Sequence, residues 1–522
     1  MKAIKRLGCL ALALSFACSM ALTGCGSSDK AATSTSTEAQ TSTQSSTSAT
    51  ESSTAPKLDP YELNCYFLAP QTKDLPLVQE EVNKLLTEKI NATVKLNYFF
   101  WDSYQDKQKL VVASGEKIDV MFSPSWWGWS TFVAQKAWLD LDELLEKYGP
   151  DIKKNINPAY LKAPIIDGKL YAIPTNKDMF GVGGVLVNKA LAEKYGFDFS
   201  NIKTPRDFEP MLQTIKEKEP GIVPFVSAQG DHASYFTQDA VVHISQTEVP
   251  VGYKKTDGEI KVVNLEETPE YVEIDKMSRE WYNKGYINKD VATLKDSMPV
   301  KKAQKAFMWA EQLKPGKNDE MKAQLGYDLI QVNAYKDIPY YATTGDLTNS
   351  MLVIPRTSKD PARAMMFINL LFSDKQIKNL LDWGIENKHY KKISENQIDF
   401  ADGVTADNSG YTGIAQWAMG GDQFLDYLWA NENPDKWKAM KAFNESAKPE
   451  KLLGWVFNPE PVKTEIATLA TVGKNMGQPL HEGIVDYDQY YPKMKTSLEK
   501  AGMQKVCEEA QKQIDTFLAS QK

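Results

Sequence analysis

Short apolar runs alternate with amphipathic helical segments from residue 61 onward, and this alternation most constrains the fold. Residues 61–69, 92–100 and 118–122 are rich in β-branched and aromatic residues and predict strands. The segment between the first two carries apolar residues on one helical face: Val78, Val82, Leu85 and Leu86. Strands that alternate with helices form βαβ units, so we expect an α/β fold with a mostly parallel sheet.

Later segments continue this pattern. Residues 167–198 contain two short extended runs and then a helical run, as expected where a chain crosses between lobes. Thr204, Pro205 and Asp207 form a helix start signal. Residues 346–381 pair a strand with a periodic helix, and the remainder to residue 522 is mainly helical. With 522 residues, 42% of them hydrophobic, we expect two or more domains.

The charge pattern excludes one class of partner. The formal net charge is −7, and removal of residues 1–24 with Lys2, Lys5 and Arg6 changes it to −7 − 3 = −10. Basic residues are interspersed with acidic ones, without a basic run that contains aromatics. We therefore expect no nucleic-acid partner.

The first residues predict export. A basic start, an apolar run from Leu7 to Leu22 and small residues before Cys25 are typical of a signal peptide spanning residues 1–24. The apolar run is shorter than the roughly 20 residues of a membrane-spanning helix. Residues 22–25 (LTGC) resemble a bacterial lipoprotein lipobox, which implies cleavage before Cys25 and acylation of that cysteine. The alternative is an ordinary secreted protein cleaved nearby.

Residues 25–56 then predict a disordered tether. From Gly26 to Pro56 the chain is rich in Ser and Thr and contains no Leu, Ile, Val, Met or aromatic residue. Such a segment cannot bury enough apolar area to offset the entropy of ordering. Its root-mean-square reach is on the order of 30 Å. We expect a protein on the outer face of the cytoplasmic membrane of a Gram-positive cell, held by lipid.

The remaining cysteines and histidines give no catalytic or metal motif. Cys65 and Cys507 are too few for a disulfide framework; we expect buried free thiols, with a disulfide as the alternative. The sequence contains no G-x-S-x-G motif of a serine hydrolase, no H-E-x-x-H zinc motif, no phosphate-binding loop and no EF-hand loop. Glu386 and His389 lie one helical turn apart but lack a third ligand. We expect no enzyme activity, no cofactor and no metal.

Several stretches in order resemble the extracellular solute-binding proteins of ABC importers, family 1, the maltose-binding type. They are GEKIDVMFSPSWW, AWLDLDELLEKYGPDI, DGKLYAIPTNKD, VLVNKALAEKYGFD, IPRTSKDPARAMMFINLLFSD and WGIENKHY. The tail GWVFNPEPVKTEIATL is similar to the closing region of a Gram-positive lipoprotein subfamily. With the lipobox, these stretches cover residues 25–483.

This resemblance implies a two-lobed, periplasmic-binding-protein-like α/β fold of type II with hinge crossovers and a helix-rich C-terminal part. Mapped here, the N-terminal lobe takes residues 57–175 and 345–380. The C-terminal lobe takes residues 176–344 and 381–522. The resemblance also implies a monomer that grips its ligand in the cleft as the lobes close, and then delivers it to the permease.

The tryptophans in SPSWWGWST are the first candidates for ligand binding. Trp126, Trp127 and Trp129 follow the carboxyl end of the third strand, where open α/β sheets place their ligands. An indole face suits the apolar C–H face of a sugar. Adjacent residues of an extended segment point in opposite directions, so Trp126 and Trp127 would not both face the cleft in that conformation. The alternative for each ring is core packing.

Further candidates lie in stretches similar to ligand-contacting regions of the family. They are Asp178, Trp309, Glu311, Trp383, Glu386, Trp455 and Phe457. The carboxylates would hydrogen-bond hydroxyls and the rings would stack on the ligand. For each, a solvated carboxylate or ordinary packing under the cleft is the alternative.

We therefore expect a lipid-anchored receptor that binds a carbohydrate, an oligosaccharide in particular, for an ABC importer. Three alternatives remain open. The first is a receptor of the same fold for a peptide or other organic solute. The second is a surface enzyme that processes glycans, because a carboxylate pair is defined by separation in space rather than by sequence spacing. The third is a structural or adhesive lipoprotein.

Overall fold

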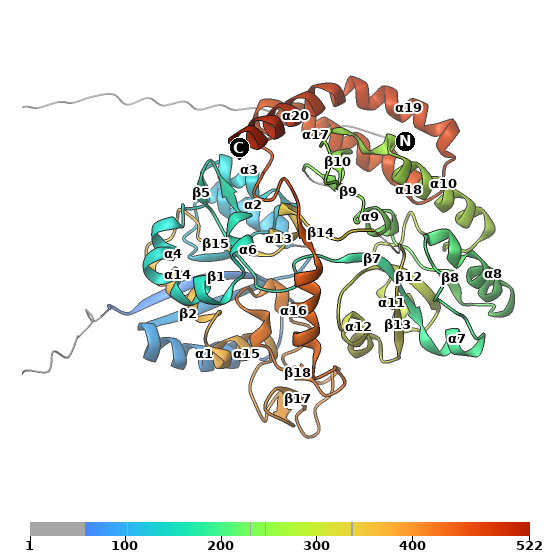
Figure 1. Ribbon diagram of the computed structural model, residues 1–522. Coiled ribbons are helices and arrows are strands. Elements are labelled where there is room, and N and C mark those ends of the chain that lie inside the picture. Colours follow the sequence, from blue (N-terminus) through green and yellow to red (C-terminus); the bar gives the residue numbers. More distant parts are fainter. Residues whose placement is uncertain (1–57, 102, 230, 246, 336–337, 522) are drawn as a thin grey trace, which may run out of the picture. The chain divides into compact units, whose positions relative to one another are not determined.

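The computed structural model describes residues 58–101, 103–229, 231–245, 247–335 and 338–521 (Figure 1). The expected signal peptide, Cys25 and the tether, residues 1–56, lie outside the described residues. None of the helices in the described part of the chain is long and apolar enough to span a bilayer.

A five-stranded sheet organises the first part of the fold, in the order β2-β1-β3-β15-β6. The strands are β1 (Tyr61–Leu68), β2 (Ala92–Phe99), β3 (Val120–Phe122), β15 (Met351–Val353) and β6 (Ile173–Pro174). β1 pairs in parallel with β2 and β3, whereas β15 runs antiparallel to β3 and β6. The three strands predicted from the sequence are present and parallel, as expected.

Helices cover this sheet. α1 (Leu75–Ile90) packs on β2, and its buried face is Val78, Val82, Leu86 and Ile90, close to the predicted one. α14 (Pro361–Leu370) packs on β1, and α15 (Lys375–Trp383) packs on α1. The remaining elements here are α2 (Tyr104–Ser114), α3 (Trp129–Ala134), α4 (Asp142–Tyr148), α5 (Pro150–Asn155), α6 (Pro158–Lys162), β4 (Ile165–Ile166) and β5 (Lys169–Leu170).

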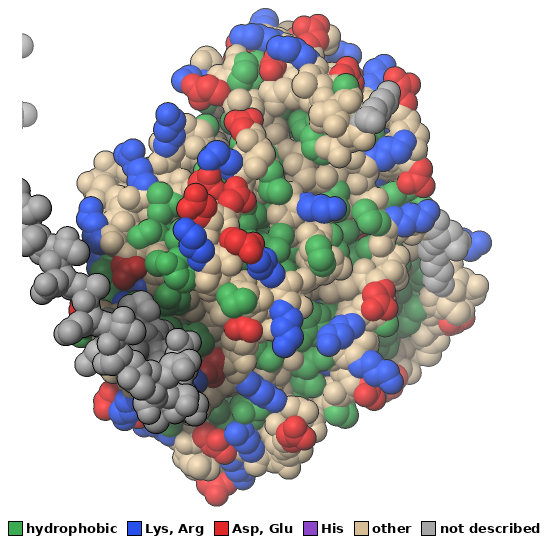
Figure 2. All heavy atoms as spheres, turned by 60° about the vertical axis from the view of Figure 1, so that its left-hand side comes forward, with side chains coloured by type: hydrophobic (Ala, Val, Ile, Leu, Met, Phe, Trp, Pro, Cys, Tyr) green, Lys and Arg blue, Asp and Glu red, His purple; other side chains and the backbone are tan. Residues whose placement is uncertain are grey.

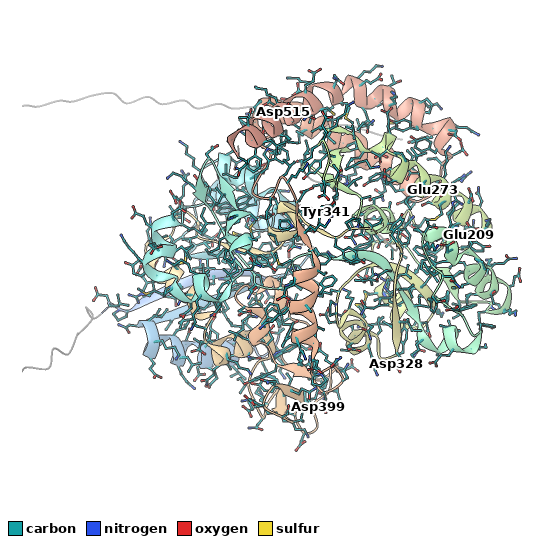
Figure 3. All side chains as sticks on the ribbon, in the orientation of Figure 1. Glu209, Glu273, Asp328, Tyr341, Asp399 and Asp515 are labelled. Atoms are coloured by element: carbon teal, nitrogen blue, oxygen red, sulfur yellow. The ribbon has the colours of Figure 1, made fainter. Side chains whose placement is uncertain are left out.

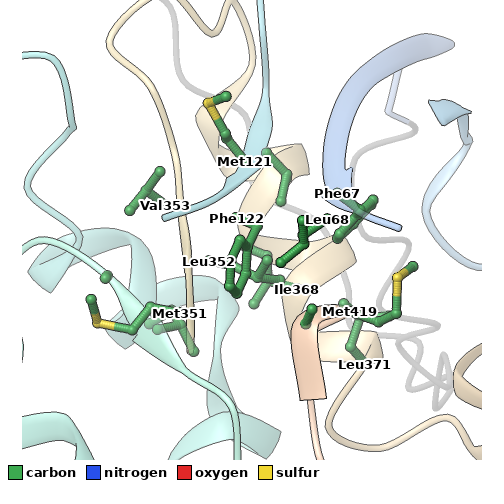
Figure 4. Close-up of a cluster of buried hydrophobic side chains, with 14 of the residues drawn as sticks. Phe67, Leu68, Met121, Phe122, Met351, Leu352, Val353, Ile368, Leu371 and Met419 are labelled. Atoms are coloured by element: carbon green, nitrogen blue, oxygen red, sulfur yellow. The ribbon is translucent and has the colours of Figure 1, made fainter. Parts of the chain in front are cut away.

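The first core lies between these strands and helices (Figure 4). Figure 4 labels Phe67 and Leu68 of β1, Met121 and Phe122 of β3, Leu352 of β15 and Ile368 of α14 among the side chains of this core. These side chains are fully or almost fully buried. Burial of one such side chain stabilises the fold by about 1.5–3 kcal/mol, so this core fixes where the strand ends lie. Cys65 is buried in β1 and Cys507 is partly buried in α20; both are free thiols, as expected.

A second, four-stranded sheet has the order β13-β7-β12-β8. The strands are β7 (Val182–Asn188), β8 (Val223–Phe225), β12 (Ala306–Leu313) and β13 (Leu329–Asn333). β7 is antiparallel to β12 and β13, while β8 and β12 are parallel. The associated helices are α7 (Lys189–Lys194), α8 (Glu209–Lys218), α9 (Asp231–Thr237), α10 (Pro269–Lys284), α11 (Met298–Lys302) and α12 (Lys317–Leu325).

This sheet has its own core, with Phe208, Leu212 and Trp281 fully buried against the strands. The predicted helix start is present: Thr204 and Asp207 form a capping box on the turn Pro205–Phe208, which leads into α8. On the outer side, Arg206 binds the carboxylates of Glu209, Glu273 and Glu280; Figure 3 labels the first two.

A third core belongs to the C-terminal helices. These are α17 (Lys463–Val472), α18 (Gln478–His481), α19 (Tyr487–Lys500) and α20 (Met503–Ser520), with a π-helical segment at Gly473–Gly477. They pack on a small sheet of β9 (Val241–His243), β10 (Val251–Lys254) and β11 (Val263–Asn264). Met494, Leu498 and Val506 are fully buried there. The C-terminal part is helix-rich, as expected.

The chain passes three times between the first body and the rest of the fold. Residues 175–181 join β6 to β7, and residues 334–350 lead from β13 to β15. The second pass contains β14 (Tyr341–Ala342) and α13 (Thr344–Leu347), and Figure 3 labels Tyr341 in it. The third pass, after Met419 of the first core, contains α16 (Lys436–Ser446) and β19 (Lys448–Pro449), which pairs with β14. A small sheet of β16 (Tyr390–Lys392), β17 (Gln397–Phe400) and β18 (Leu428–Trp429) precedes α16.

Two α/β bodies, each with its own sheet and core, confirm the predicted α/β class. The lobe boundaries at 175/176, 344/345 and 380/381 stay a prediction. Within the segment assigned to the second lobe, Tyr411, Ile414, Ala418 and Met419 pack against the first core. The contacts that join the first core and this segment include a hydrogen bond between the Tyr98 and Tyr411 hydroxyls, 2.9 Å apart.

Candidate functional site

Aromatic rings gather where β2 and β3 end. Trp101 follows β2, and Trp126 and Trp127 follow β3. The rings of Trp101 and Trp126 stack with centroids 5.8 Å apart and planes at 28°, and Trp127 meets Trp101 edge-on at 5.7 Å. Phe100 and Trp101 are 44% and 48% exposed, which is unusual for such large apolar side chains. We call Phe100, Trp101, Trp126, Trp127 and Trp417 the aromatic platform.

Buried groups hold this platform in place. Trp127 stacks on Tyr104, with centroids 5.6 Å apart and planes at 15°. The buried Tyr104 hydroxyl lies 2.8 Å from the Phe122 carbonyl and 3.1 Å from that of Tyr66, within donating range of both. Trp126 Nε1 donates to the Asn349 carbonyl at 2.8 Å. These contacts hold the rings of Trp126 and Trp127 against the first core.

Trp417 reaches the platform from a distant part of the chain. Its ring lies 6.0 Å from that of Trp101 and 5.9 Å from that of Phe122. The Trp417 carbonyl accepts a hydrogen bond from the Thr175 hydroxyl at 3.2 Å, in the first pass between the sheets. The platform therefore adjoins a segment that connects the two bodies.

The expectation that Trp126 and Trp127 face opposite ways applies to an extended segment, and this segment is not extended. Residues Ser125–Trp127 form a 3₁₀ turn that ends at Gly128, whose φ of 81° favours glycine. The two rings consequently lie 4.3 Å apart on one side of the chain. Trp129 begins α3 and is 1% exposed, so it belongs to the core.

The second sheet contributes polar groups at the carboxyl end of β8. The Ser227 hydroxyl donates to Asp231 Oδ1 at 2.7 Å. Burial is the largest cause of two pKa shifts: it raises the pKa of Asp231 and lowers the pKa of Lys301. The charge of Glu311 raises both pKa values, while Lys301 lowers the pKa of Asp231 and Asp231 raises that of Lys301. Lys317 Nζ lies 3.4 Å from Glu311 Oε1. We call Asp231, Lys301, Glu311 and Lys317 the polar group; it can offer both donors and acceptors to a ligand.

Trp309 lies under this polar group rather than on a surface. It is 1% exposed, and Lys301 Nζ sits 4.9 Å from its ring centroid. Glu311, two residues further along β12, remains partly accessible. Of these two predicted residues, Glu311 is therefore the more accessible one, and the ligand-binding role of both stays a prediction.

Asp178 lies in a buried ion network at the first pass. Lys177 Nζ and Lys314 Nζ lie 2.9 and 3.1 Å from its carboxylate oxygens. Burial by itself raises the pKa of Asp178, but the two ammonium groups outweigh burial and hold that pKa well below its usual range. The network continues through Glu320 and Lys436 to Glu432. Asp178 therefore joins the first pass, α12 and α16.

The other predicted residues lie apart from the platform. Trp383 packs edge-on against Trp429, with centroids 5.4 Å apart. Glu386 pairs with Lys392 at 3.2 Å. Trp455 and Phe457 are 8% and 4% exposed and belong to the third core. His389 Nε2 lies 3.1 Å from Asp74 Oδ2.

The structure thus brings Trp126 and Trp127 together with three aromatics that sequence reasoning missed: Phe100, Trp101 and Trp417. A signal for two of them was available, because Phe100 and Trp101 directly follow the carboxyl end of the second predicted strand. Trp417 has no such signal, since its position depends on long-range packing.

The surface charge is mixed. On the face shown in Figure 2, acidic and basic side chains are interspersed among exposed apolar ones. The aromatic platform itself carries no formal charge. This arrangement suits a solute recognised by stacking and hydrogen bonds.

Comparisons with known proteins agree with this geometry. Residues 69–378 match the bacterial extracellular solute-binding protein family, and residues 451–519 match a domain of unknown function. A carbohydrate ABC transporter substrate-binding protein of Streptococcus pneumoniae is 30% identical over 474 residues, which cover 88% of this chain and 91% of that protein.

Solved structures show the same fold. The N-glycan transport solute-binding protein NgtS of S. pneumoniae has a TM-score of 0.78 at 27% identity, covering 89% of this chain and all of that chain. It has also been solved with Man5GlcNAc, at a TM-score of 0.73 over 89% and 99% of the two chains. The alginate-binding protein AlgQ2 shares the fold, with a TM-score of 0.62 at 18% identity over 88% and 98%.

These matches confirm the resemblance, the two-lobed fold of type II and a role in binding rather than catalysis, since the family consists of solute-binding proteins. The family description also places its members outside the cell. Because the family match covers more than half of the sequence, this chain belongs to the bacterial extracellular solute-binding protein family.

Proposed function

We propose that this protein is the substrate-binding protein of a carbohydrate ABC transporter and that its ligand is an oligosaccharide. The stack of Trp101 on Trp126 carries the proposal, because two neighbouring indoles with exposed surface offer room for more than one sugar ring. The curated relative is a carbohydrate transporter protein.

The ligand would lie between the platform and the polar group. Sugar C–H faces would rest on the indoles, while Asp231, Glu311 and Lys317 would bind hydroxyls. Closure of the lobes about the three passes would bring the two surfaces together. The ligand would stabilise the closed form only to the extent that it binds that form better than the open one.

Delivery would occur at the membrane. Lipid on Cys25 and the tether of residues 25–56 would hold the protein at the outer face of the cytoplasmic membrane, within reach of the permease. Acylation through more than one chain makes such anchoring stable. Metabolic labelling with a palmitate analogue tests this part: we expect label on the natural protein and none on Cys25→Ser.

The structural relatives suggest the first glycans to test. NgtS has been solved with Man1GlcNAc and Man5GlcNAc, so a glycan of mannose and N-acetylglucosamine heads the panel. Calorimetry should show micromolar or tighter binding to a neutral oligosaccharide. A panel that contains Man5GlcNAc, fructo-oligosaccharides, alginate oligosaccharides and peptides separates the alternatives, and binding to peptides alone would overturn the carbohydrate proposal.

Two further measurements test the alternatives: whether the glycan is chemically changed, and whether the protein becomes more compact when the glycan binds. Chromatography of the glycan after long incubation should return it unchanged, and any shortened product would favour a glycan-processing enzyme. X-ray scattering with and without glycan should show a smaller radius of gyration in the bound form. Equal curves across the whole panel would favour a structural lipoprotein.

A further inference from the structure

Lys301 is the most deeply buried cation of the polar group, and it lacks an anionic partner. The residue lies near the end of α11 and is 8% exposed. In the part of the chain that the structure describes, no carboxylate forms an ion pair with Lys301 Nζ and no oxygen accepts a hydrogen bond from it. The ammonium group instead lies over the ring of Trp309, with Nζ 4.9 Å from the centroid. The ring face attracts the charge, but it offers the three N–H donors no oxygen acceptor.

The surroundings of Lys301 make this arrangement unfavourable without a ligand. An ammonium group taken out of water costs free energy unless it is paired and hydrogen-bonded. Burial is the largest cause that lowers the pKa of Lys301. Nearby charges act on the same pKa: Glu311, Asp231 and Asp296 raise it, and Lys317 lowers it. The three carboxylates thus act on Lys301 through their charge without binding it directly.

The two carboxylates of the polar group each keep one oxygen without a donor. Asp231 Oδ1 accepts from the Ser227 hydroxyl at 2.7 Å. Glu311 Oε1 lies 3.4 Å from Lys317 Nζ and accepts from the Gln312 amide at 3.3 Å. Among the described residues, Asp231 Oδ2 and Glu311 Oε2 accept no hydrogen bond. The polar group therefore contains a donor that lacks an acceptor, near acceptors that lack donors.

A hydroxyl group satisfies both kinds of atom. A lysine ammonium only donates and an ionised carboxylate only accepts, so a group that does one of the two satisfies only one side. A hydroxyl oxygen accepts from Lys301 while its hydrogen goes to Asp231 or Glu311, and both hydrogen bonds are strengthened by charge. A sugar ring carries several such hydroxyls side by side.

The charge balance of the polar group favours a neutral sugar. The positive charges of Lys301 and Lys317 are matched in number by the negative charges of Asp231 and Glu311. An acidic sugar would add a negative charge beside two carboxylates, whereas a neutral ring leaves the balance unchanged.

We propose that Lys301 is a specificity-determining residue of the glycan site: it donates to hydroxyl oxygens of a neutral sugar ring, while Asp231 and Glu311 accept the hydroxyl hydrogens. This role rests on the proposed function. A site with a buried donor rejects a ligand that offers no acceptor there, because the donor then stays desolvated and unpaired.

Lys301→Met tests this role, because methionine keeps much of the aliphatic stem and removes the ammonium group. The probe is the neutral glycan that binds most tightly in the panel above, with Man5GlcNAc tested first. We expect its dissociation constant to rise about tenfold or more. The melting temperature of the ligand-free variant should stay the same or rise, because it no longer buries an unpaired charge. Lys302→Met, at the exposed next residue of α11, is the matched control and should keep the natural affinity.

Proton uptake is a second readout, which a merely structural lysine would not change. A hydroxyl that accepts from Lys301 favours the charged ammonium, so glycan binding should raise the lowered pKa of Lys301. The natural protein should then take up protons when it binds glycan at about pH 9, and its affinity should fall as the pH rises further. Calorimetry in two buffers of different ionisation enthalpy measures this uptake, which should be absent in Lys301→Met.

The outcomes distinguish the role of Lys301 from the proposed function itself. If the natural protein binds no glycan of the panel, both are refuted. If the natural protein binds a neutral glycan and Lys301→Met binds it equally tightly, only the role of Lys301 is refuted. Alginate oligosaccharides carry carboxylates, so tighter binding of these than of every neutral glycan would overturn the preference for a neutral ring.

Discussion

The indole rings of Trp101 and Trp126 stack with their centroids 5.8 Å apart, although the two residues follow different strands of the first sheet. β1 lies between β2 and β3 in that sheet, so the two strands end on the same edge and their following residues meet there. The order of the strands in the sheet therefore brings these two rings of the aromatic platform together.

Replacement of Trp101 by alanine should weaken glycan binding about ten- to hundredfold. Its ring is 48% exposed, and the loss of an aromatic contact together with its apolar area costs about 1.4–2.8 kcal/mol, which corresponds to that change. Calorimetry with the best glycan of the panel measures the effect. Leu110→Ala, at an apolar position on α2 that is 59% exposed, is the control and should leave the dissociation constant unchanged. Equal affinities in both variants would refute the platform as the binding surface.

Removal of the Tyr104 hydroxyl should lower stability without a comparable loss of affinity. Tyr104→Phe keeps the ring under Trp127 but leaves the Phe122 carbonyl without its 2.8 Å partner. We expect the free energy of unfolding to fall by about 1–3 kcal/mol, and the glycan dissociation constant to change less than twofold. Urea unfolding and calorimetry give the two values. A large loss of affinity at unchanged stability would mean that the hydroxyl itself contacts the ligand.

Asp178→Asn should destabilise the protein strongly. The substitution leaves Lys177 and Lys314 buried without their shared carboxylate, and a buried ion pair broken on one side costs about 3–5 kcal/mol. Asp328→Asn removes an exposed partner of Lys322 and should change stability much less. Denaturant unfolding compares the two. Weaker glycan binding at unchanged stability would instead support the ligand contact that the sequence suggested.

Glu450 should make stability depend on pH. Burial raises its pKa to about 7, although the Tyr253 hydroxyl donates to it at 2.9 Å. The unfolded chain ionises this group near its ordinary pKa, so the native state holds the extra proton between the two values. The stabilising contribution is complete below about pH 4.5 and is lost as the pH rises through about 7.

Glu450→Gln tests this prediction. The variant should lose part of the decline in melting temperature between pH 5 and pH 8 and should be more stable than the natural protein at the upper end. Glu386→Gln, which alters an exposed glutamate, should keep the natural profile. Parallel profiles for the natural protein and Glu450→Gln would contradict the raised pKa. Asp239 has a pKa raised to about 6 by burial, and its contribution has the same sign.

Local patterns were sufficient for the elements near the site. The face of α1, the capping box at Thr204 and the three parallel strands follow from periodicity and helix start signals, which depend on neighbouring residues only. The placement of Trp126 and Trp127 after a strand end follows from the same reasoning. The lobe boundaries and the ligand-binding roles of individual residues remain predictions.

Residues of the same type differ in burial and in their contacts, and their spacing in the sequence does not predict the difference. Trp126 and Trp129 are three positions apart, yet Trp126 is half-buried on the platform and Trp129 is 1% exposed in the core. The 3₁₀ turn before Gly128 decides this difference. Asp178 was predicted to bind hydroxyls, and the structure pairs it with Lys314, which follows β12 and lies 136 residues further along the chain. Sequence spacing does not reveal that ion pair, and the ligand-binding role of Asp178 stays a prediction.

The sequence by itself determined the α/β class, the family and the strand end where aromatics gather, because these depend on periodicity, local signals and ordered motifs along the chain. Only the tertiary structure decided which rings share a surface. The ring of Trp417 contacts that of Trp101, more than three hundred residues earlier in the chain. His481 contacts Glu266, more than two hundred residues earlier. Such long-range contacts depend on how whole helices and strands pack. The free energy of that packing is spread over many contacts, so no single segment of the sequence predicts them.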